Sequence, residues 1–372
     1  MKRDLAVTGL VLLACVLWLA GRIGRDDAAP AALDSTALLG TAPESFRRVT
    51  GPEPLSFPRD HAAHPGFRSE WWYFTGNLFD AQGRRYGLQF TLFRFGLPED
   101  ALPEGTDFSA DAAWMAHLAV TDVETGRFLH RERFARGALD LAGATEQRWW
   151  LRDWSARRTG GGWRLAAEAD TFGVDLDLRA VKPVVLPGER GYSRKGPEPG
   201  NASRYYQIPR LEASGRLRLP GRETVEVSGL AWLDREWGSS QLGPGIAGWD
   251  WFALQLDDGR DLMLYRLRTD DGEASRFSSG TLTEADGSFR TLGAQSFSLT
   301  PMRRWTDGLG VEWPVEWRVR VPEAGLDLKV RPVMDDQRWD ASVIYWEGAV
   351  DAEDTESGRA VGRGYLELSG YR

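Results

Sequence analysis

The stretch Ser69 to Phe95, SEWWYFTGNLFDAQGRRYGLQFTLFRF, decides the fold. Two runs in which apolar residues alternate lie on either side of Asp80-Ala81-Gln82-Gly83, a sequence typical of a tight turn. The stretch therefore predicts a β-hairpin. Its first run opens with a carboxylate, Glu70, directly before four aromatic residues. The hairpin is thus expected to carry an acid among aromatic rings.

A related pattern returns between Gly248 and Arg268, GWDWFALQLDDGRDLMLYRLR. Aromatic residues again surround a carboxylate, Asp250, and an Asp-Gly turn again leads into a strand that ends in Arg. The segments Gly229 to Asp234 and Gly364 to Tyr371 are also loosely similar to each other. We therefore expect one architecture to occur twice, each copy being closed by its own last strand.

Length and composition favour two domains of β-structure. The chain has 372 residues, which is too long for one ordinary domain. Its 17 Trp, 42 Gly and 19 Pro, with few runs of helical period, indicate short strands and tight turns. We predict an all-β class with a first domain over 45–238 and a second over 239–372. The 54 acidic residues outnumber the 46 basic ones, so no nucleic-acid partner is expected.

The N-terminus predicts export. Lys2 and Arg3 precede an apolar run from Leu5 to Gly21, so residues 1–25 are predicted to form a hydrophobic helix that acts as a signal. An uncleaved inner-membrane anchor, a cleaved signal peptide and a lipoprotein modified at Cys15 all stay open. Residues 26–44 are rich in Ala, Pro and Asp and predict a flexible tether. The rest of the chain is then expected in the periplasm.

Familiar catalytic signatures do not occur in the sequence. It contains no phosphate-binding loop, no dinucleotide-binding glycine pattern, no HExxH and no G-x-S-x-G. The only cysteine lies in the N-terminal apolar run. We therefore expect neither a cofactor nor a metal ion, and the groups left to carry chemistry are carboxylates set among aromatic residues.

Such carboxylates suit acid catalysis. Burial against apolar rings raises the pKa of a carboxyl, which then holds a proton at neutral pH. Aromatic faces stabilise the cation that forms when an alkene is protonated. The candidate acids are Glu70, Asp234 and Asp250; the candidate polar partners are His117, Tyr206 and Arg235; the candidate aromatic walls are Trp72, Trp232, Trp237 and Trp249.

Two other interpretations use the same residues. In the first, the carboxylates pair with arginines such as Arg94, Arg235 and Arg266 while the tryptophans fill the cores. Alternatively, an open groove lined by Trp and carboxylates would bind sugars. Convergence of Glu70 and Asp234 on one buried cavity would favour catalysis, whereas exposure of the two at separate rims would favour a carrier.

Several blocks together resemble the AttH/CrtC family, lipocalin-like proteins that include carotenoid 1,2-hydratases and exported members called predicted secreted hydrolases. The resemblance covers the chain from about Pro58 to the C-terminus. It implies two calycin-type antiparallel barrels packed together, with a site near their junction. The blocks are SEWWYFTGNL, Ala116 to Val120, Tyr205-Tyr206, LAWLDREWGSSQL, GWDWFALQLDDGRDLMLYRLR and GYLELSGY.

The hydratase branch adds water across a terminal isoprenoid double bond without a cofactor, and it is associated with a His-x-Trp pair and a Tyr-x-Asp pair. Here the first pair reads Arg235-Glu236-Trp237, and the second, if it falls at Tyr265-Arg266-Leu267, lacks its acid. The resemblance implies a protein that binds an isoprenoid or polyene-like molecule and hydrates or isomerises it. The alternative is a non-catalytic lipid carrier or envelope accessory protein with a transport-system partner.

Overall fold

The computed structural model describes residues 35–98 and 110–372. The predicted signal at 1–25 and the first part of the predicted tether lie outside these residues. The N-terminal helix, the membrane anchor, export to the periplasm and a transport partner therefore stay predictions. Within the described residues, no helix is both long and apolar enough to span a membrane.

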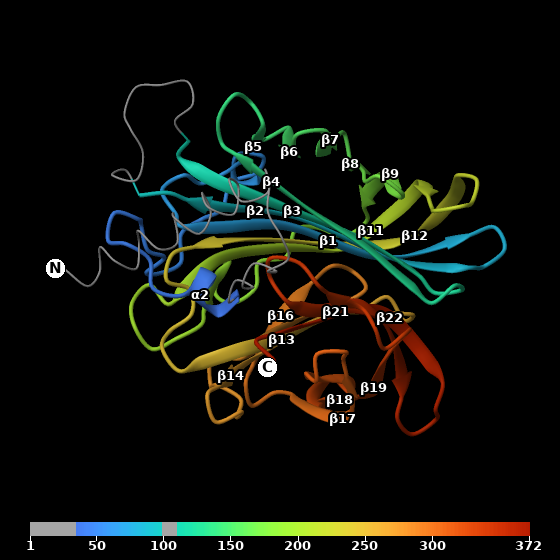
Figure 1. The fold of residues 1–372 in the computed structure, drawn as a ribbon. Helices are drawn as coiled ribbons and strands as arrows, with labels where there is room; N and C mark the ends of the chain where they lie inside the picture. Colours follow the sequence, from blue (N-terminus) through green and yellow to red (C-terminus); the bar gives the residue numbers. More distant parts are fainter. Residues whose placement is uncertain (1–34, 99–109) are drawn as a thin grey trace.

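Two antiparallel sheets make up most of the molecule (Figure 1). The first has twelve strands in the order β4-β3-β2-β1-β12-β11-β9-β8-β7-β6-β5, with β10 paired to β11. Strand β6 packs across the sheet against β2, β3 and β4, so the sheet curls into a barrel. The strands are β1 (Ser69–Asp80), β2 (Arg85–Gly96), β3 (Ala112–Asp122), β4 (Arg127–Arg136), β5 (Ala142–Ala144), β6 (Arg148–Leu151), β7 (Trp154–Thr159), β8 (Gly162–Glu168), β9 (Gly173–Ala180), β10 (Tyr192–Arg194), β11 (Ala202–Arg218) and β12 (Val225–Gly238).

The second sheet has ten strands in the order β16-β15-β14-β13-β22-β21-β19-β18-β17, with β20 paired to β21. It lies below the first sheet in Figure 1. Within this second sheet, the ring centroids of Phe252 on β13 and Trp317 on β18 are 5.5 Å apart. The strands are β13 (Ile246–Leu256), β14 (Asp261–Thr269), β15 (Ser279–Thr283), β16 (Phe289–Gly293), β17 (Ser298–Thr306), β18 (Glu312–Val321), β19 (Leu326–Pro332), β20 (Arg338–Trp339), β21 (Tyr345–Asp354) and β22 (Ala360–Ser369).

The opening hairpin forms as the sequence predicted. Strands β1 and β2 pair in register and turn through Gly83, whose φ of +77° is readily available to glycine. The carboxylate of Asp80 accepts hydrogen bonds from the backbone N–H groups of Gln82 and Arg84. These bonds satisfy backbone donors that the tight turn would otherwise leave unpaired.

The predicted repeat is also present. Glu70 on β1 lies opposite Arg94 on β2, and Asp250 on β13 lies opposite Arg266 on β14. Strand β12 pairs with β1 in the first sheet, as β22 pairs with β13 in the second. The predicted all-β class and the two barrel-like sheets are therefore confirmed.

Both faces of the central strands are buried. On β1, Trp72 and Phe74 point into the core of the first barrel, whereas Tyr73 belongs to a separate cluster between the two sheets. A period of two places successive side chains on opposite faces. Residues that are neighbours in the sequence therefore face different regions, either the core of the first barrel or the space between the two sheets.

The end of the predicted tether is structured, contrary to expectation. Ser35–Leu39 forms a short helix, α2, and the N–H of Leu242 donates to the carbonyl of Leu39 at 3.1 Å. Leu38 and Leu39 pack against residues of the two sheets. These two leucines anchor the segment by packing against the sheets. The Ala/Pro-rich composition of the whole stretch did not indicate this contact. Within residues 35–98 and 110–372, the other helical segments are two short 3₁₀ turns, Arg59–His61 and Pro322–Ala324.

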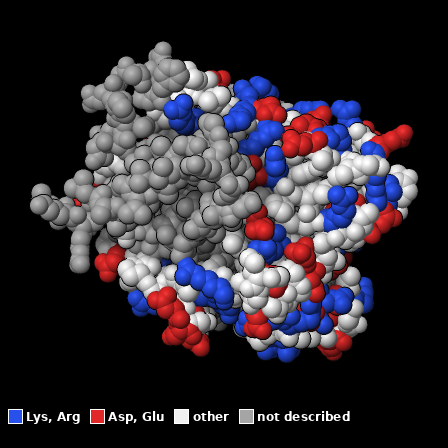
Figure 2. All heavy atoms as spheres, in the orientation of Figure 1, with Lys and Arg blue, Asp and Glu red and all other residues white. Residues whose placement is uncertain are grey.

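Ion pairs join the two sheets. Asp261 on β14 accepts from Arg210 on β11 at 2.7 Å and lies 2.6 Å from the ammonium nitrogen of Lys182. Arg85 on β2 pairs with Asp351 on β21 at 2.5 Å. On the outside, Lys and Arg side chains are interspersed with Asp and Glu over the described surface in view (Figure 2).

Candidate active site

The sequence-predicted site residues fall into three separate places. On β12, Arg235 and Trp237 face the core of the first barrel, whereas Asp234 and Trp232 face the space between the sheets. Asp250 lies inside the second barrel, where it contacts Arg266, Arg268 and Tyr371. Glu70 and Asp234 are both buried, but they do not share a cavity.

Glu70 is held as an anion inside the first barrel. Its carboxylate accepts from Arg235 at 2.6 Å and from Arg94 at 3.3 Å, and also from the backbone N–H of His64. Burial opposes the charged form of Glu70, but Arg235, His64 and Arg94 outweigh it and lower the pKa to about 2. A carboxyl with this pKa is not a neutral general acid, so the predicted catalytic role of Glu70 is not supported.

The other predicted residues on this side complete the same cluster. The guanidinium of Arg235 lies 3.9 Å from the ring centroid of Trp72 and 4.7 Å from that of Trp237. The hydroxyl of Tyr206 is 2.6 Å from Nδ1 of His61. Arg235, Trp72, Trp237 and Tyr206 therefore close the first barrel and stay outside the cavity described below.

Asp250 has the equivalent place in the second barrel. It accepts from Arg266 at 2.7 Å, from Arg268 at 2.6 Å and from the hydroxyl of Tyr371 at 2.7 Å. Two guanidinium groups therefore bind this carboxyl group directly. The alternative interpretation, in which carboxylates pair with arginines, therefore describes Asp250 and Glu70.

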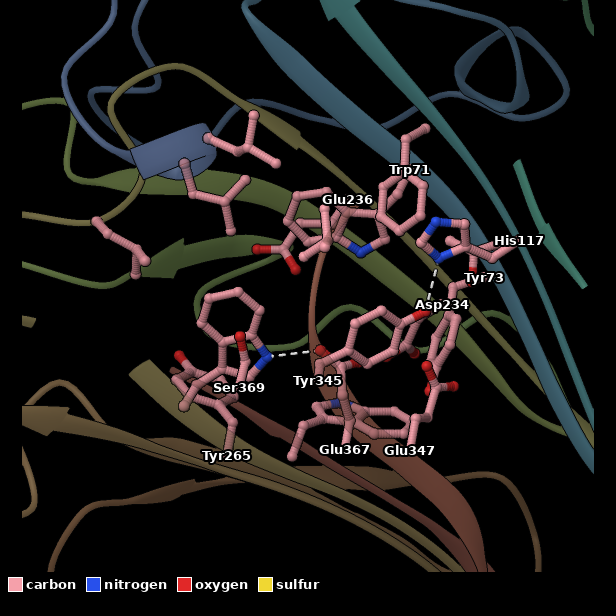
Figure 3. A pocket seen from close by; sticks show the side chains of 18 of the residues that line it. Trp71, Tyr73, His117, Asp234, Glu236, Tyr265, Tyr345, Glu347, Glu367 and Ser369 are labelled. Carbon is pink, nitrogen blue, oxygen red and sulfur yellow. Dashed lines mark hydrogen bonds between the residues drawn. The ribbon is translucent and has the colours of Figure 1, made fainter. Parts of the chain in front are cut away.

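A cavity lies between the two sheets, and we refer to it as the interface cavity (Figure 3). It encloses about 1050 Å³ outside protein atoms, including the solvent at its mouth. Aromatic and aliphatic side chains make up most of its wall, which suits an apolar ligand. Its lining residues are Leu38, Leu39, Trp71, Tyr73, Thr91, Phe93, Phe95, Met115, His117, Lys195, Tyr205, Asp234, Glu236, Leu242, Trp249, Trp251, Tyr265, Leu267, Val343, Tyr345, Glu347, Glu367 and Ser369.

Asp234 is the one predicted acid that reaches this cavity. Its carboxyl accepts from the hydroxyl of Tyr205 at 2.5 Å and from the indole N–H of Trp232 at 2.7 Å. Burial raises its pKa to about 7, and the neighbouring Glu236 and Glu367 add to the increase against the two hydrogen bonds. Asp234 therefore has the protonation behaviour predicted for a general acid.

Two further acids come from the second sheet. Glu347 on β21 and Glu367 on β22 are directly opposite each other; Glu347 is buried and Glu367 is partly buried. Glu347 accepts from the hydroxyl of Tyr73 at 2.5 Å, and Glu367 accepts from the indole N–H of Trp249 at 2.8 Å. No Lys or Arg among the described residues forms an ion pair with either.

This arrangement favours neutral carboxyls. Burial raises the pKa of Glu367 to about 7. Burial, followed by the charge of Glu367, raises the pKa of Glu347 well above its usual range. Two carboxylates side by side in an apolar wall repel each other, so the pair is expected to retain at least one proton at neutral pH.

One cation reaches the cavity among the described residues. The ammonium nitrogen of Lys195 lies 2.6 Å from Glu236, and 4.7 Å from the ring centroid of Tyr265. Burial opposes the charge on Lys195, but Glu236 outweighs this effect and raises the pKa of the lysine. Lys195 thus neutralises Glu236, one of the four carboxyls that line the cavity. The other three, Asp234, Glu347 and Glu367, have no cation paired to them among the described residues.

His117, one of the predicted polar partners, also lines the cavity. It is fully buried on β3, with Nδ1 2.6 Å from the hydroxyl of Tyr345 and Nε2 3.0 Å from Glu132. Trp249 also lines the cavity, and its indole N–H donates to Glu367 at 2.8 Å. Asp234, His117 and Trp249 therefore share the cavity, whereas Trp232 donates to Asp234 and is not itself a lining residue.

Sequence reasoning missed Glu347, Glu367 and Lys195. A signal for the two glutamates was present: Tyr345-Trp346-Glu347 and Tyr365-Leu366-Glu367 each place an acid within a strand of otherwise apolar alternation. Lys195 carried no such signal, because it lies in a loop of glycine, proline and charged residues.

The fold and the cavity together define a lipocalin-like protein with two packed β-barrel domains. A family model described as AttH-like matches residues 48–371. The chain therefore belongs to the AttH-like family, and the resemblance predicted from the sequence is confirmed. No match is found among curated proteins.

Solved structures share the whole architecture. A candidate AttH protein from Nitrosomonas europaea is 37% identical, with 88% of this chain and 100% of that chain covered and a TM-score of 0.80. Kievitone hydratase from Nectria haematococca is 15% identical over 87% and 98% of the two chains, with a TM-score of 0.62. CghA in complex with Sch210972 is 13% identical over 89% and 97%, with a TM-score of 0.50. At these low identities, the last two structures show only that they share their fold with this chain.

The hydratase-type pairs implied by the resemblance do not meet in this chain. Arg235 and Trp237 close the first barrel, whereas Tyr265 lines the interface cavity. The acids of the cavity instead come from Asp234, Glu347 and Glu367.

Proposed function

We propose that this protein is a cofactor-independent hydro-lyase that adds water to a carbon–carbon double bond of an apolar, isoprenoid or polyene-like molecule held in the interface cavity. The observation that carries the proposal is the pair Glu347 and Glu367, one buried and one partly buried carboxyl in direct register on the cavity wall, with no Lys or Arg of the described residues paired to them. Similarity in fold to kievitone hydratase supports the same reaction class.

The chemistry follows from one proton held by two carboxyls. The neutral member donates its proton to an alkene carbon, and the positive charge develops on the neighbouring carbon. The rings of Trp249 and Trp251 line the cavity beside Glu367 and stabilise that charge. A water molecule forms the new C–O bond and gives a proton to the ionised member, which restores the pair.

Asp234 lies in the same cavity as the Glu347–Glu367 pair and is a further acidic group there. Its two oxygens already accept from Tyr205 and Trp232, whereas Glu367 accepts from Trp249 through Oε1. The Glu347–Glu367 pair is therefore placed first in the reaction, and Asp234 orients the polar end of the substrate or the attacking water.

The test is incubation of the purified protein with a membrane-lipid extract in ¹⁸O-labelled water, followed by mass spectrometry of the extracted lipids. An apolar compound that gains one labelled water supports the proposal. Glu367→Gln and Glu347→Gln should lower the rate of this conversion about 10²–10⁴-fold. The matched control is Glu353→Gln, also on β21 but paired with Arg331 on the outside, which should convert normally. Retention of an unchanged lipid would overturn hydration and favour a carrier.

A further inference from the structure

A row of polar side chains connects the cavity carboxyls with the edge of the first sheet. Its centre is His117 on β3, which is fully buried. Each ring nitrogen has one partner: Nδ1 is 2.6 Å from the hydroxyl of Tyr345 and Nε2 is 3.0 Å from Oε2 of Glu132. An imidazole with a partner at both nitrogens can accept a proton at one and release one at the other.

The inner end of the path reaches the reacting pair. The hydroxyl of Tyr345 is 2.6 Å from Nδ1 of His117, and Tyr345 and Glu347 lie two positions apart on β21 and both line the interface cavity. Glu347 in turn lies opposite Glu367 on the next strand. The side chains of His117, Tyr345 and Glu347 follow one another along the cavity wall in Figure 3.

The outer end of the path touches solvent. Glu132 lies on β4, the edge strand of the first sheet, and its side chain is 12% exposed. Its carboxylate is fixed by the hydroxyl of Ser342, which donates at 2.5 Å. Hydrogen bonds to His117 and Ser342 favour the anion against burial and lower the pKa of Glu132.

Apolar rings enclose the middle of the path. Trp339 stacks on His117 with the ring centroids 4.4 Å apart, and Phe93 contacts its edge at 5.3 Å. The other titratable groups nearby are His130 on β4 and Asp340; burial lowers the pKa of His130. Rings packed on the imidazole leave the two hydrogen bonds as its polar contacts.

We propose that Glu132, His117 and Tyr345 form a proton path between solvent and the Glu347–Glu367 pair. The inference rests on the proposed function, because a pair that donates and recovers protons needs a way to equilibrate with solvent. A proton on Glu132 passes to Nε2 of His117, and the proton on Nδ1 passes to the oxygen of Tyr345. Tyr345 gives its own proton to Glu347. Hydration consumes no net proton, so each proton that enters along this path also leaves along it. The outward transfer returns His117 to its starting tautomer.

The experiment measures proton exchange without turnover. The full chain is transferred from H₂O into D₂O, and the infrared band of protonated buried carboxyls is followed as it shifts on deuteration. The variants are Glu132→Gln, which keeps the geometry at the sheet edge, and His117→Gln, which retains hydrogen-bonding groups. Both should slow the exchange by about tenfold or more, a change of about 1.4 kcal/mol in the barrier.

The matched control is His64→Gln, a histidine that contacts Glu70 and Asp60 in the first barrel, away from the path. Its exchange rate should equal that of the unmodified protein. Unchanged exchange in a folded Glu132→Gln protein would overturn the path, because protons would then reach the pair by another route. A complete lack of the protonated band in the unmodified protein would instead overturn the proposed acids themselves.

Discussion

Glu347 and Glu367 lie directly opposite each other on β21 and β22, with both carboxyls in the interface cavity. Like charges at directly opposed positions of a sheet are destabilising, and burial removes the water that would screen them. The fold therefore holds at least one proton in this pair at the expense of stability. Placement of a costly pair in a cavity, away from the cores, is the arrangement expected of a functional site.

The hydration rate should depend on pH through this pair. The pKa of Glu367 is raised to about 7 and that of Glu347 is raised well above its usual range, so Glu367 ionises as pH rises through about 7 while Glu347 keeps the transferable proton. We expect the rate of water addition to rise as pH rises through about 7, because the pair then has one neutral donor and one ionised acceptor. A rate that stays constant between pH 6 and 9 in a protein that remains folded would contradict a carboxyl donor.

Asp234→Asn should change how stability depends on pH. The folded-state pKa of about 7 lies above the usual 3.8, so the folded state binds this proton more tightly than the unfolded state. That stabilisation is complete below pH 4 and is lost as pH rises through about 7, a change on the order of 4 kcal/mol. Asp234→Asn should not show this decrease in the free energy of unfolding, because asparagine carries no titratable proton. Urea unfolding at pH 5 to 8 measures it, and parallel stability curves for the two proteins would refute the raised pKa.

Glu70→Gln should destabilise the protein strongly at pH 7. The change leaves the buried Arg235 without its carboxylate, and removing one member of a buried pair typically costs about 3–5 kcal/mol. The matched control is Glu212→Gln, an exposed carboxylate paired with Arg179, for which about 0–1 kcal/mol is expected. Urea denaturation compares the two, and equal effects would argue against a buried ion pair at Glu70.

Val343→Phe should weaken ligand binding. Val343 is buried in the cavity wall, and a larger ring there would occupy space that an apolar ligand uses. An overpacking penalty of about 1–3 kcal/mol corresponds to a loss of roughly 5- to 150-fold in affinity. The control is Val225→Phe at the start of β12, outside the cavity. Titration with the retained lipid measures both, and equal affinities would place the ligand elsewhere.

The sequence by itself determined the β-class, the repeat and the hairpins. Alternation along Glu70 to Phe74 separates two faces, and Asp80 with Gly83 provides a turn that few other pairs of residues allow. These are local effects, because a period of two and a left-handed glycine act within a few residues. The same alternation already places Asp234 and Arg235 on opposite faces of β12.

Only the tertiary structure decided which face carries chemistry. Both faces of β12 are buried, so hydrophobicity does not reveal that Arg235 meets Glu70 in a barrel while Asp234 opens into the cavity. The distinction arises from packing of the second sheet on the first. That packing brings Glu347 and Glu367 to Asp234 from more than 100 residues away in the sequence. The pKa of a carboxyl follows from such distant neighbours and from lost water, and neither is written in its local sequence.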